Sequence, residues 1–524
     1  MATLYSLLAD ADADAPCLRS GDHILSYGEF RERVRRVAGG LQRAGLKRGD
    51  CLALWLPNTA DWLALAFACG RCGIDVLSVN LRFGPAEIGD FIERAGCRAI
   101  AYAPRHAGKD NEALLGAIDA AQIATVAVAI TADGAPSGLQ GRTTVGLQAL
   151  LEGEPDGEEQ GTGTDPCIVF SSSGTTSRPK LIVHSQERTA RHARDVAPRL
   201  GMLDGPSRVF LGVPFCGAFG YAVAITSFAG QACITVEDAF DPARAVRLFD
   251  EHRITHMFGT NDMVERILES AGPDWRPAEL RTLVHANFTP GLVTVPARAE
   301  AQGLPMQGAY GMSEIFGLFA VQRADAPLPR RAESGGVPNA PQAHIRVRHP
   351  DTGELLPPME QGELEIFTPN VMLGYLNDPA ATAKAFMPDG YLRTGDLGYV
   401  NGDGGFTHVS RIGDVIRVGG FLVNPLEIEE TAMQVPGLVA CQVVEVEAAQ
   451  STRPVAFVLV EPGHEHDEAA LIAHCKSRLA IFKVPIRFFR LDEYPVTVGP
   501  NGTKVRKNEL RQLAQSRLRQ ENPA

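Results

Sequence analysis

The chain has 524 residues, of which 45% are hydrophobic and 21% charged, and its formal net charge is -12. This length predicts roughly two to four domains of an ordinary globular protein, and an acidic chain without a basic stripe is not expected to bind nucleic acid. Residues 1–16 lack the basic start and apolar core of a signal peptide. The most apolar stretch, residues 52–70, is broken by Pro57, Asn58 and Asp61 and cannot span a bilayer. We therefore expect a cytoplasmic protein with no integral membrane association.

The ten cysteines do not form the dense pattern of a disulfide scaffold. Cys69 and Cys72 make a CxxC pair, but no second pair or nearby histidine completes a metal site. Because both lie in an apolar stretch with a helical pattern, we expect two buried thiols and no structural metal.

Helix-like and strand-like segments alternate from residue 26 to about 130, as in GEFRERVRRVAGGLQRAG, CLALWLP and DVLSVN. The acidic, turn-rich segment 151–166 is expected to be a surface loop. Further strands are expected at residues 167–170, 209–215, 232–237, 255–260, 282–288 and 305–311. With helix-like segments between several of them, this order predicts an α/β fold with largely parallel sheets.

The pattern changes in the last third of the chain. Residues 340–410 contain short strands and Gly-Asp turns, which indicate a small β-rich subdomain. After residues 411–414 a new mixture of helix and strand begins, and its length of about 110 residues is a usual domain size. We expect an N-terminal domain over residues 1–410 and a C-terminal α+β domain over residues 411–524.

The segment SSSGTTSRPK, residues 171–180, follows a short apolar strand. Its small hydroxyl residues and glycine can fold backbone N–H groups around phosphate oxygens, and Arg178 and Lys180 add positive charge. Taken alone, the segment is equally well explained as a solvent-exposed loop. It is not a Walker loop, because a proline precedes the lysine. No GxGxxG opens a helix, so neither a nicotinamide nor a flavin cofactor is expected.

Five further segments follow this loop in a fixed order. They are YGMSE at 310–314, the stretches 362–386 and 389–400, RIGDVIRVGGFLVNPLEIEE at 411–430 and GPNGTKVRKNEL at 499–510. In this order they resemble the motifs of the acyl-adenylate-forming enzymes, which include acyl-CoA synthetases, peptide-synthetase adenylation domains and luciferases. The resemblance runs from about residue 26 to 511.

The resemblance implies a fold and a reaction. The fold is a large N-terminal domain of two helix-flanked sheets with a β-rich subdomain, and a small mobile C-terminal domain. In the reaction, a carboxylate attacks the α-phosphate of ATP, pyrophosphate leaves, and a thiol then attacks the acyl-adenylate. ATP, Mg²⁺ and CoA are the expected substrates and cofactors.

The resemblance also implies which residues bind the phosphates. Ser173, Gly174, Thr175 and Thr176 would surround the β- and γ-phosphates, with Lys180 nearby. Glu314 would hold Mg²⁺, a hard cation that prefers oxygen ligands, and Ser313 would offer a hydroxyl to the phosphates. Without the resemblance, Ser313 and Glu314 would indicate only the start of a helix.

On the nucleoside side, Tyr310 and Gly311 would lie against adenine, Asp396 would accept both ribose hydroxyls, and Arg411 would contact the ribose or a phosphate. A single tyrosine after a strand is more often a core residue. A single aspartate beside glycine is more often turn chemistry.

The resemblance gives the C-terminal domain the catalytic lysine. Lys504 follows a glycine turn and would bridge the substrate carboxylate and the α-phosphate, and Lys507 is its nearest competitor in the alignment. Gly413 aligns with the hinge about which the domain rotates. Gly419 and Gly420 would then let the backbone approach the pantetheine arm of CoA.

The acyl pocket is expected to be apolar. Its walls would come from the segments VPFCGAFGY and HANFTP and from the residues after Glu314, namely Phe215, Cys216, Phe219, Asn287, Phe288, Phe316 and Phe319. PFCGAFG has no acidic residue to pair an α-amino group, so a free amino acid is not expected. The composition favours a hydrophobic acid, fatty or aromatic.

Two alternatives stay open beside an AMP-forming acyl-CoA synthetase. The acyl group could be loaded onto the pantetheine of an acyl carrier protein. Alternatively, the chain could be an inactive nucleotide-binding sensor, which the retention of Glu314, Asp396, Arg411 and Lys504 argues against. Oligomeric state is not readable from the sequence, and a homodimer stays open.

Overall fold

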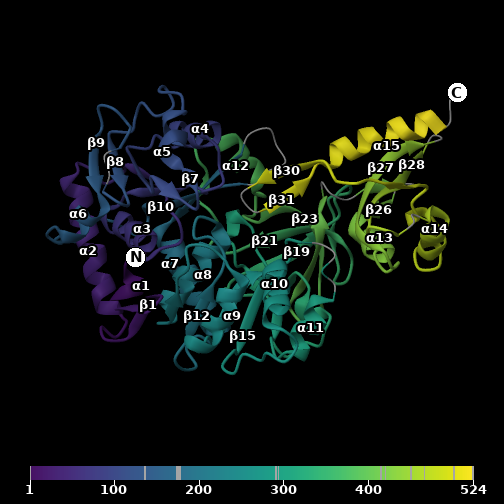
Figure 1. Ribbon diagram of the computed structural model, residues 1–524, viewed down its shortest axis with the longest axis horizontal. Helices are drawn as coiled ribbons and strands as arrows, with labels where there is room; N and C mark the ends of the chain where they lie inside the picture. The colour runs from purple at the N-terminus through teal and green to yellow at the C-terminus, as the bar shows by residue number, and fades with distance from the viewer. Residues whose placement is uncertain are drawn as a thin grey trace.

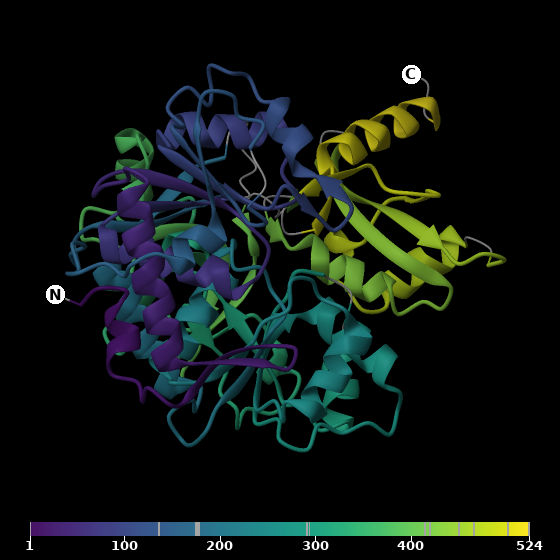
Figure 2. The same ribbon diagram turned by 60° about the vertical axis from the view of Figure 1, so that its left-hand side comes forward.

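The computed structural model describes residues 2–134, 137–172, 179–289, 292, 294–412, 416–418, 421–448, 451–464, 467–499 and 502–521. It has a large N-terminal domain of helix-flanked sheets and a small C-terminal domain set to one side (Figures 1 and 2). The α/β fold expected from the sequence is therefore confirmed. The expected boundary between residues 410 and 411 stays a prediction, and Arg411 is the last residue of a strand in the larger sheet.

An eight-stranded sheet forms the first half of the N-terminal domain in the described part of the chain. Its spatial order is β22 (Gly374–Tyr375), β11 (Leu181–Ser185), β10 (Pro166–Ser171), β4 (Asp75–Ser78), β3 (Cys51–Trp55), β5 (Ala99–Tyr102), β8 (Val128–Thr131) and β9 (Thr143–Gly146). Strands β10 to β9 in this order are parallel, whereas β11 runs antiparallel to both of its neighbours.

A fourteen-stranded sheet, again counted over the described residues, forms the second half. Its order is β2 (His23–Ser26), β1 (Pro16–Ser20), β13 (Cys233–Thr235), β12 (Arg208–Leu211), β14 (His256–Thr260), β15 (Thr282–Ala286), β16 (Met306–Tyr310), β17 (Ala320–Val321), β18 (Gly335–Pro338), β24 (Phe406–Arg411), β23 (Leu392–Val400), β21 (Gly362–Phe367), β19 (His344–Arg348) and β20 (Leu355–Leu356). The run from β1 to β16 is parallel, and the run from β17 to β20, which contains the β-rich region, is antiparallel. Strands expected from the sequence are present as β10, β12, β13, β14, β15 and β16.

One layer of helices lies between the two sheets and buries a face of each. It comprises α2 (Tyr27–Arg43), α3 (Ala60–Cys72), α7 (Gln186–Arg199) and α8 (Ala218–Ala229). Along β3, Leu52 and Leu54 face this layer, whereas Ala53 and Trp55 pack in the separate core on the opposite face. Because both faces are covered, the parallel strands are apolar on both sides, which explains their continuous hydrophobic runs.

Shorter helices cover the outer faces. Helices α4 (Pro85–Ala95) and α5 (Asn111–Gly116) pack on the eight-stranded sheet, and α9 (Pro242–Glu251), α10 (Asn261–Ala271) and α11 (Val295–Ala301) pack on the fourteen-stranded sheet. The remaining elements of the domain are α1 (Ser6–Ala9), β6 (Arg105–His106), β7 (Lys109–Asp110), α6 (Leu147–Glu152), α12 (Pro379–Ala385) and the single 3₁₀ turns η1 (Ser313–Ile315) and η2 (Arg330–Ala332).

Helix boundaries follow local capping. The Ser26 side chain accepts from the Glu29 amide, and the Glu29 carboxylate accepts from the Ser26 amide, which makes a capping box at the start of α2. At the start of α3 the Thr59 side chain accepts one hydrogen bond from the Trp62 amide, and at the start of α9 the Asp241 side chain accepts one from the Arg244 amide. Such polar residues at these places satisfy amides that have no partner within the helix.

The C-terminal domain is built on a three-stranded sheet of β27 (Leu438–Ala448), β28 (Ser451–Val460) and β29 (Phe488–Arg490). One face packs against α13 (Pro425–Ala432) and α14 (Glu468–Lys476), and the other against α15 (Lys507–Glu521). The 3₁₀ turn η4 (Ile481–Lys483) lies before β29. Two hairpins, β25 (Ile416–Val418) with β26 (Phe421–Val423) and β30 (Val496–Gly499) with β31 (Gly502–Val505), complete the domain.

The expected surface loop at residues 151–166 is only partly on the surface. Half of its residues are exposed, but the Asp156 side chain is fully buried and lies 2.6 Å from Nε of the buried Arg71. This ion pair fastens the loop to α3. Cys69 and Cys72, on the same helix, are buried as expected. Among the described residues, no helix is long and apolar enough to cross a membrane.

Several histidines lie in the core of the N-terminal domain. Burial lowers the pKa of His192 to about 3 and the pKa values of His184, His256 and His285 to about 4. Each is therefore neutral in the folded protein at neutral pH but takes up a proton near pH 6.5 once unfolded. The stabilisation that comes from their neutral state is complete above pH 6.5 and is lost as the pH falls toward 4.

We predict that the free energy of unfolding falls steeply between pH 6.5 and pH 4. One pKa unit corresponds to about 1.4 kcal/mol, so each of these histidines removes on the order of 3 kcal/mol over that range. Urea unfolding at a series of pH values measures the effect. His192→Leu should flatten the decline, and the matched change at the exposed His23, His23→Leu, should not. An equal slope in the protein and in His192→Leu would contradict the prediction.

Candidate active site

The ends of the hydroxyl-rich loop are tied together by hydrogen bonds. Ser171 ends β10 and pairs with Leu181 at the start of β11. The Ser172 amide donates to the Lys180 carbonyl at 2.8 Å, and the Lys180 amide donates to the Ser172 hydroxyl at 2.9 Å. The predicted phosphate ligands Ser173, Gly174, Thr175 and Thr176 lie outside the described residues, so their role stays a prediction.

Lys180 and Glu314 both contact the side chain of Tyr375. The Tyr375 hydroxyl donates to Glu314 Oε1 at 2.9 Å, and Lys180 Nζ lies 4.4 Å from the centre of the Tyr375 ring. Burial, followed by the charge of Glu314, raises the pKa of Tyr375 well above its usual value, so the phenol keeps its proton. All three side chains are half-buried.

Glu314 has the chemistry of a ligand for a hard cation. It makes one side-chain hydrogen bond, and Oε2 has no hydrogen bond or ion pair with any residue that the structure describes. The described residues hold no cluster of three or more acidic, histidine or cysteine side chains suited to a metal. A cation at Glu314 would therefore take most of its ligands from substrate phosphates and water, as Mg²⁺ commonly does.

The turn that carries Ser313 and Glu314 is anchored through its backbone. His184 Nε2 donates to the Ser313 carbonyl at 2.7 Å, and the Met372 amide donates to the Glu314 carbonyl at 2.7 Å. Phe316 ends the turn with φ of 64°, a conformation that a bulky residue rarely adopts. Its ring is fully buried among the rings of Phe170, His184, His192 and Tyr221.

Tyr310, Asp396 and Arg411 form a second group at the junction of β16, β23 and β24. The Tyr310 hydroxyl donates to Asp396 Oδ2 at 2.6 Å, and Arg411 Nε lies 3.4 Å from Asp396 Oδ1. Asp396 is only 3% exposed, yet Oδ1 accepts no hydrogen bond from the described residues. A buried carboxylate oxygen normally accepts hydrogen bonds, so this oxygen suits a ligand hydroxyl.

The Tyr310 ring is itself buried, against Phe406 and His408 at centroid distances of 5.2 Å. Gly311 follows directly after β16 and is exposed. Contact of Tyr310 and Gly311 with adenine stays a prediction.

The two candidate lysines differ in their surroundings. Lys504 lies in β31, paired with Thr497 of β30, and its side chain is outside the described part of the structure. In Figure 1 this hairpin lies on the side of the C-terminal domain that faces α12 and β23. Lys507 instead begins α15, and its Nζ lies 3.5 Å from Oε1 of the buried Glu429. Gly413, Gly419 and Gly420 lie outside the described residues.

The residues predicted for the acyl pocket range from buried to exposed. Phe215 packs against Trp62 in the core, and Phe316 and Phe319 are also buried. Phe219 is half-buried, as is Cys216, whose pKa burial raises to about 12. Asn287 and Phe288 are exposed, the latter by 53%, and Asn287 Nδ2 donates to the Ala332 carbonyl at 3.2 Å. A shared pocket for this set stays a prediction.

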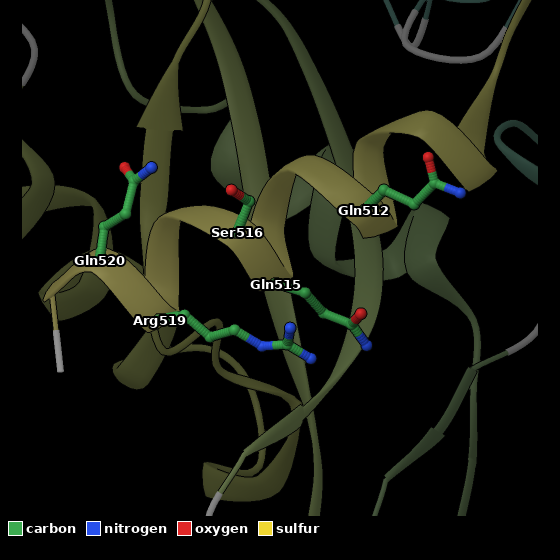
Figure 3. Close-up of a pocket in the computed structure, with 5 residues that line it drawn as sticks. All are labelled: Gln512, Gln515, Ser516, Arg519 and Gln520. Carbon is green, nitrogen blue, oxygen red and sulfur yellow. The ribbon is translucent and has the colours of Figure 1, made fainter. Parts of the chain in front are cut away.

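Two hollows in the described surface lie elsewhere. One runs along the polar face of α15 and is lined by Gln512, Gln515, Ser516, Arg519 and Gln520 (Figure 3). The other lies between α10 and α11. Neither is lined by a predicted site residue, and both are shallow features of helix surfaces.

Two residues at the site had no role in the sequence interpretation. Tyr375 lies inside the motif at residues 362–386, and this position was the only feature of the sequence that pointed to a role for it. His184 occupies an inward position of β11, where a polar residue in an apolar strand is unusual.

Comparison with known proteins supports the family that the motifs indicated. The family model for AMP-binding enzymes matches residues 8–376, and the model for the AMP-binding enzyme C-terminal domain matches residues 427–499. The chain is 31% identical over 505 residues to feruloyl-CoA synthase of Amycolatopsis sp, covering 95% of each protein. It is 28% identical over 517 residues to 3-hydroxybenzoate–CoA ligase of Aromatoleum sp. (strain CIB), covering 97% of this chain and 95% of that protein.

The fold is also that of a solved structure, ATP-bound MatB from Rhodopseudomonas palustris. The TM-score is 0.85 at 24% identity, over 98% of this chain and 99% of that one. The first family model spans well over half of the chain, and the C-terminal model matches a separate segment that follows it. The chain therefore belongs to the AMP-binding enzymes, the acyl-adenylate-forming superfamily.

Proposed function

We propose that this protein, an AMP-forming acid–thiol ligase by its family, activates an aromatic carboxylic acid with ATP and transfers the acyl group to the thiol of CoA. The observation that carries the proposal is Asp396, a buried carboxylate with one oxygen open to a ligand, held by Tyr310 and flanked by Arg411. This arrangement suits the hydroxyls of a ribose, for which a carboxylate is a strong acceptor.

In the first step, a carboxylate oxygen of the acid attacks the α-phosphorus of ATP. The bond from that phosphorus to the bridging oxygen breaks, and pyrophosphate leaves with the electron pair. Lys180 is well placed to neutralise phosphate charge, because it lies at the exit of the hydroxyl-rich loop and its ammonium contacts Tyr375, whose hydroxyl binds Glu314. Mg²⁺ bound at Glu314 would supply further charge neutralisation. Lys504 would stabilise the charge that builds up between the carboxylate and the α-phosphate.

In the second step, the thiol sulfur attacks the acyl carbon, AMP leaves with the bonding electrons, and the thiol proton passes to solvent or to AMP. Burial raises the pKa of the half-buried Cys216 to about 12, which disfavours its thiolate, and the nucleophile of this step is the thiol of CoA. The covalent product is then a thioester of CoA.

The choice of an aromatic acid rests on two kinds of support. Feruloyl-CoA synthase and 3-hydroxybenzoate–CoA ligase, which are similar to this chain along nearly their whole length, are named for aromatic acids. The segments predicted to surround the acyl group are rich in phenylalanine, and they contain no acid that would pair an amine. Aromatic side chains pack favourably against an aromatic substrate.

We predict that acid-dependent exchange between ATP and pyrophosphate will be fastest with benzoates and cinnamates. The panel should include hydroxybenzoates, hydroxycinnamates, octanoate, malonate and phenylalanine, and product formation should then be tested with CoA and with a pantetheinylated carrier protein. Exchange confined to octanoate or malonate would contradict the aromatic class. Acyl transfer to the carrier protein but not to CoA would contradict the proposed acceptor.

We predict that Lys504→Ala slows adenylation by about 10²–10³-fold, the usual cost of losing a group that stabilises developing charge. Synthetic acyl-adenylate should still be converted to the thioester at a rate close to that of the unaltered enzyme. Lys507→Ala is the matched control: because Lys507 pairs with Glu429 inside the C-terminal domain, this change should lower the melting temperature and leave the adenylation rate nearly intact. The reverse pattern would assign the catalytic role to Lys507.

A further inference from the structure

Tyr375 stands between the two charged side chains of the phosphate side of the site. Its ring lies 4.4 Å from Lys180 Nζ, and its hydroxyl donates to Glu314 Oε1 at 2.9 Å. We propose that Tyr375 is a positioning residue that keeps Lys180 and Glu314 from pairing with each other, so that both charges stay available to the nucleotide. This inference rests on the proposed function, because it assumes that the ligand is ATP.

The backbone holds Tyr375 firmly in this place. Tyr375 and Gly374 form β22, which pairs antiparallel with Ile182 and Val183 of β11. The Leu373 amide donates to the Val183 carbonyl and the Leu376 amide to the Leu181 carbonyl, each at 2.7 Å. On the other side, the Tyr375 amide donates to the Thr382 hydroxyl at 2.9 Å. These bonds therefore hold Tyr375 beside β11, the strand that follows the phosphate loop.

The same strand pairing fixes the partners of Tyr375. Lys180 immediately precedes β11, so its ammonium and the ring are held by adjacent strands. Glu314 reaches the hydroxyl from the turn after β16, and the Met372 amide binds the Glu314 carbonyl at 2.7 Å. One segment, residues 372–375, thus contacts both the backbone and the side chain of Glu314.

Tyr375 stabilises the charges of Lys180 and Glu314 without neutralising either of them. An ammonium beside a phenol ring is stabilised by the electron-rich face, and a carboxylate is stabilised by a hydroxyl donor. Neither contact cancels a charge, whereas a direct ion pair would cancel both. Among the described residues, Lys180 and Glu314 form no ion pair with each other, and neither pairs with another charge. Tyr375 thus satisfies each group while leaving its full charge in the site.

The test is direct binding of ATP, measured by calorimetry without any acid substrate, with and without Mg²⁺. In Tyr375→Leu, which removes both ring and hydroxyl, Lys180 and Glu314 can pair, and the Kd for ATP should rise about tenfold in both conditions. Tyr375→Phe keeps the ring, so Mg²⁺-free binding should stay close to that of the unaltered protein, while binding in Mg²⁺ weakens about threefold.

A double variant separates this role from a structural one. If Lys180 is captured by Glu314 in Tyr375→Leu, then Tyr375→Leu with Glu314→Gln should recover Mg²⁺-free ATP binding, because no carboxylate remains to pair with the ammonium. Glu314→Gln alone is the reference, because it removes a negative charge beside the phosphates, and after loss of packing alone the double variant would gain no more ATP binding than this reference does. Tyr27→Phe is the matched control: its hydroxyl donates to the Ala232 carbonyl at 3.0 Å in the core, and its removal should leave ATP binding unchanged.

The outcomes are distinct. Equal ATP binding by the unaltered protein and Tyr375→Leu, or a double variant that binds no better than Tyr375→Leu, would overturn the role of Tyr375. A thermal melt checks that each variant is folded, and Tyr375→Phe carries the test if Tyr375→Leu is not. Absence of ATP binding by the unaltered protein would overturn the proposed function itself.

Discussion

Burial of a single apolar layer between the two large sheets is the constraint on which the rest of this structure depends. The four helices of that layer must satisfy both sheets at once, so the sheets are held face to face. Part of the site lies where a segment crosses from one sheet to the other. The chain leaves the fourteen-stranded sheet after β21 and enters the eight-stranded sheet as β22, only seven residues after Phe367. This crossing brings Tyr375 beside Lys180 and Glu314.

The two carboxylates of the site share one feature, although only Asp396 also lies close to an arginine, with its Oδ1 3.4 Å from Arg411 Nε. Glu314 accepts one hydrogen bond from the hydroxyl of Tyr375, and Asp396 accepts one from the hydroxyl of Tyr310. Each carboxylate keeps a second oxygen without a hydrogen bond to the described residues. A neutral phenol orients a carboxylate without removing its charge. The site is therefore preorganised for ligands that bring positive charge or hydroxyl donors, as a cation and a ribose do.

The sequence was most informative where local chemistry decides the structure. Short, strand-like runs predicted β10 and β12 to β16 correctly, because both faces of a parallel strand are buried. The motif order predicted the family, and the resemblance assigned Tyr310, Asp396 and Arg411 to the nucleoside side of the ligand. What the sequence could not reveal depends on partners far apart in the chain. Asp156 looked like part of an exposed acidic loop, but Arg71 buries it.

The same limit applies closer to the site. The contact of Tyr375 with Glu314 and that of His184 with the Ser313 carbonyl join residues that are 61 and 129 positions apart. No local pattern encodes such pairings. They arise because strand pairing and the shared helix layer place these segments together, and they could be recognised only after the sheets had been assembled.

Phe316 gives this arrangement a further property. A left-handed backbone position is usually filled by glycine, which adopts it without strain. Here the strain is offset by the packing of a ring against Phe170, His184, His192 and Tyr221. Residues in contact have non-additive effects on stability, so these five positions and the turn that carries Glu314 form one mutational unit. A substitution of any of these core rings is expected to shift the turn that carries Glu314. A substitution of Phe316 is expected to preserve stability only when the neighbouring rings are changed with it.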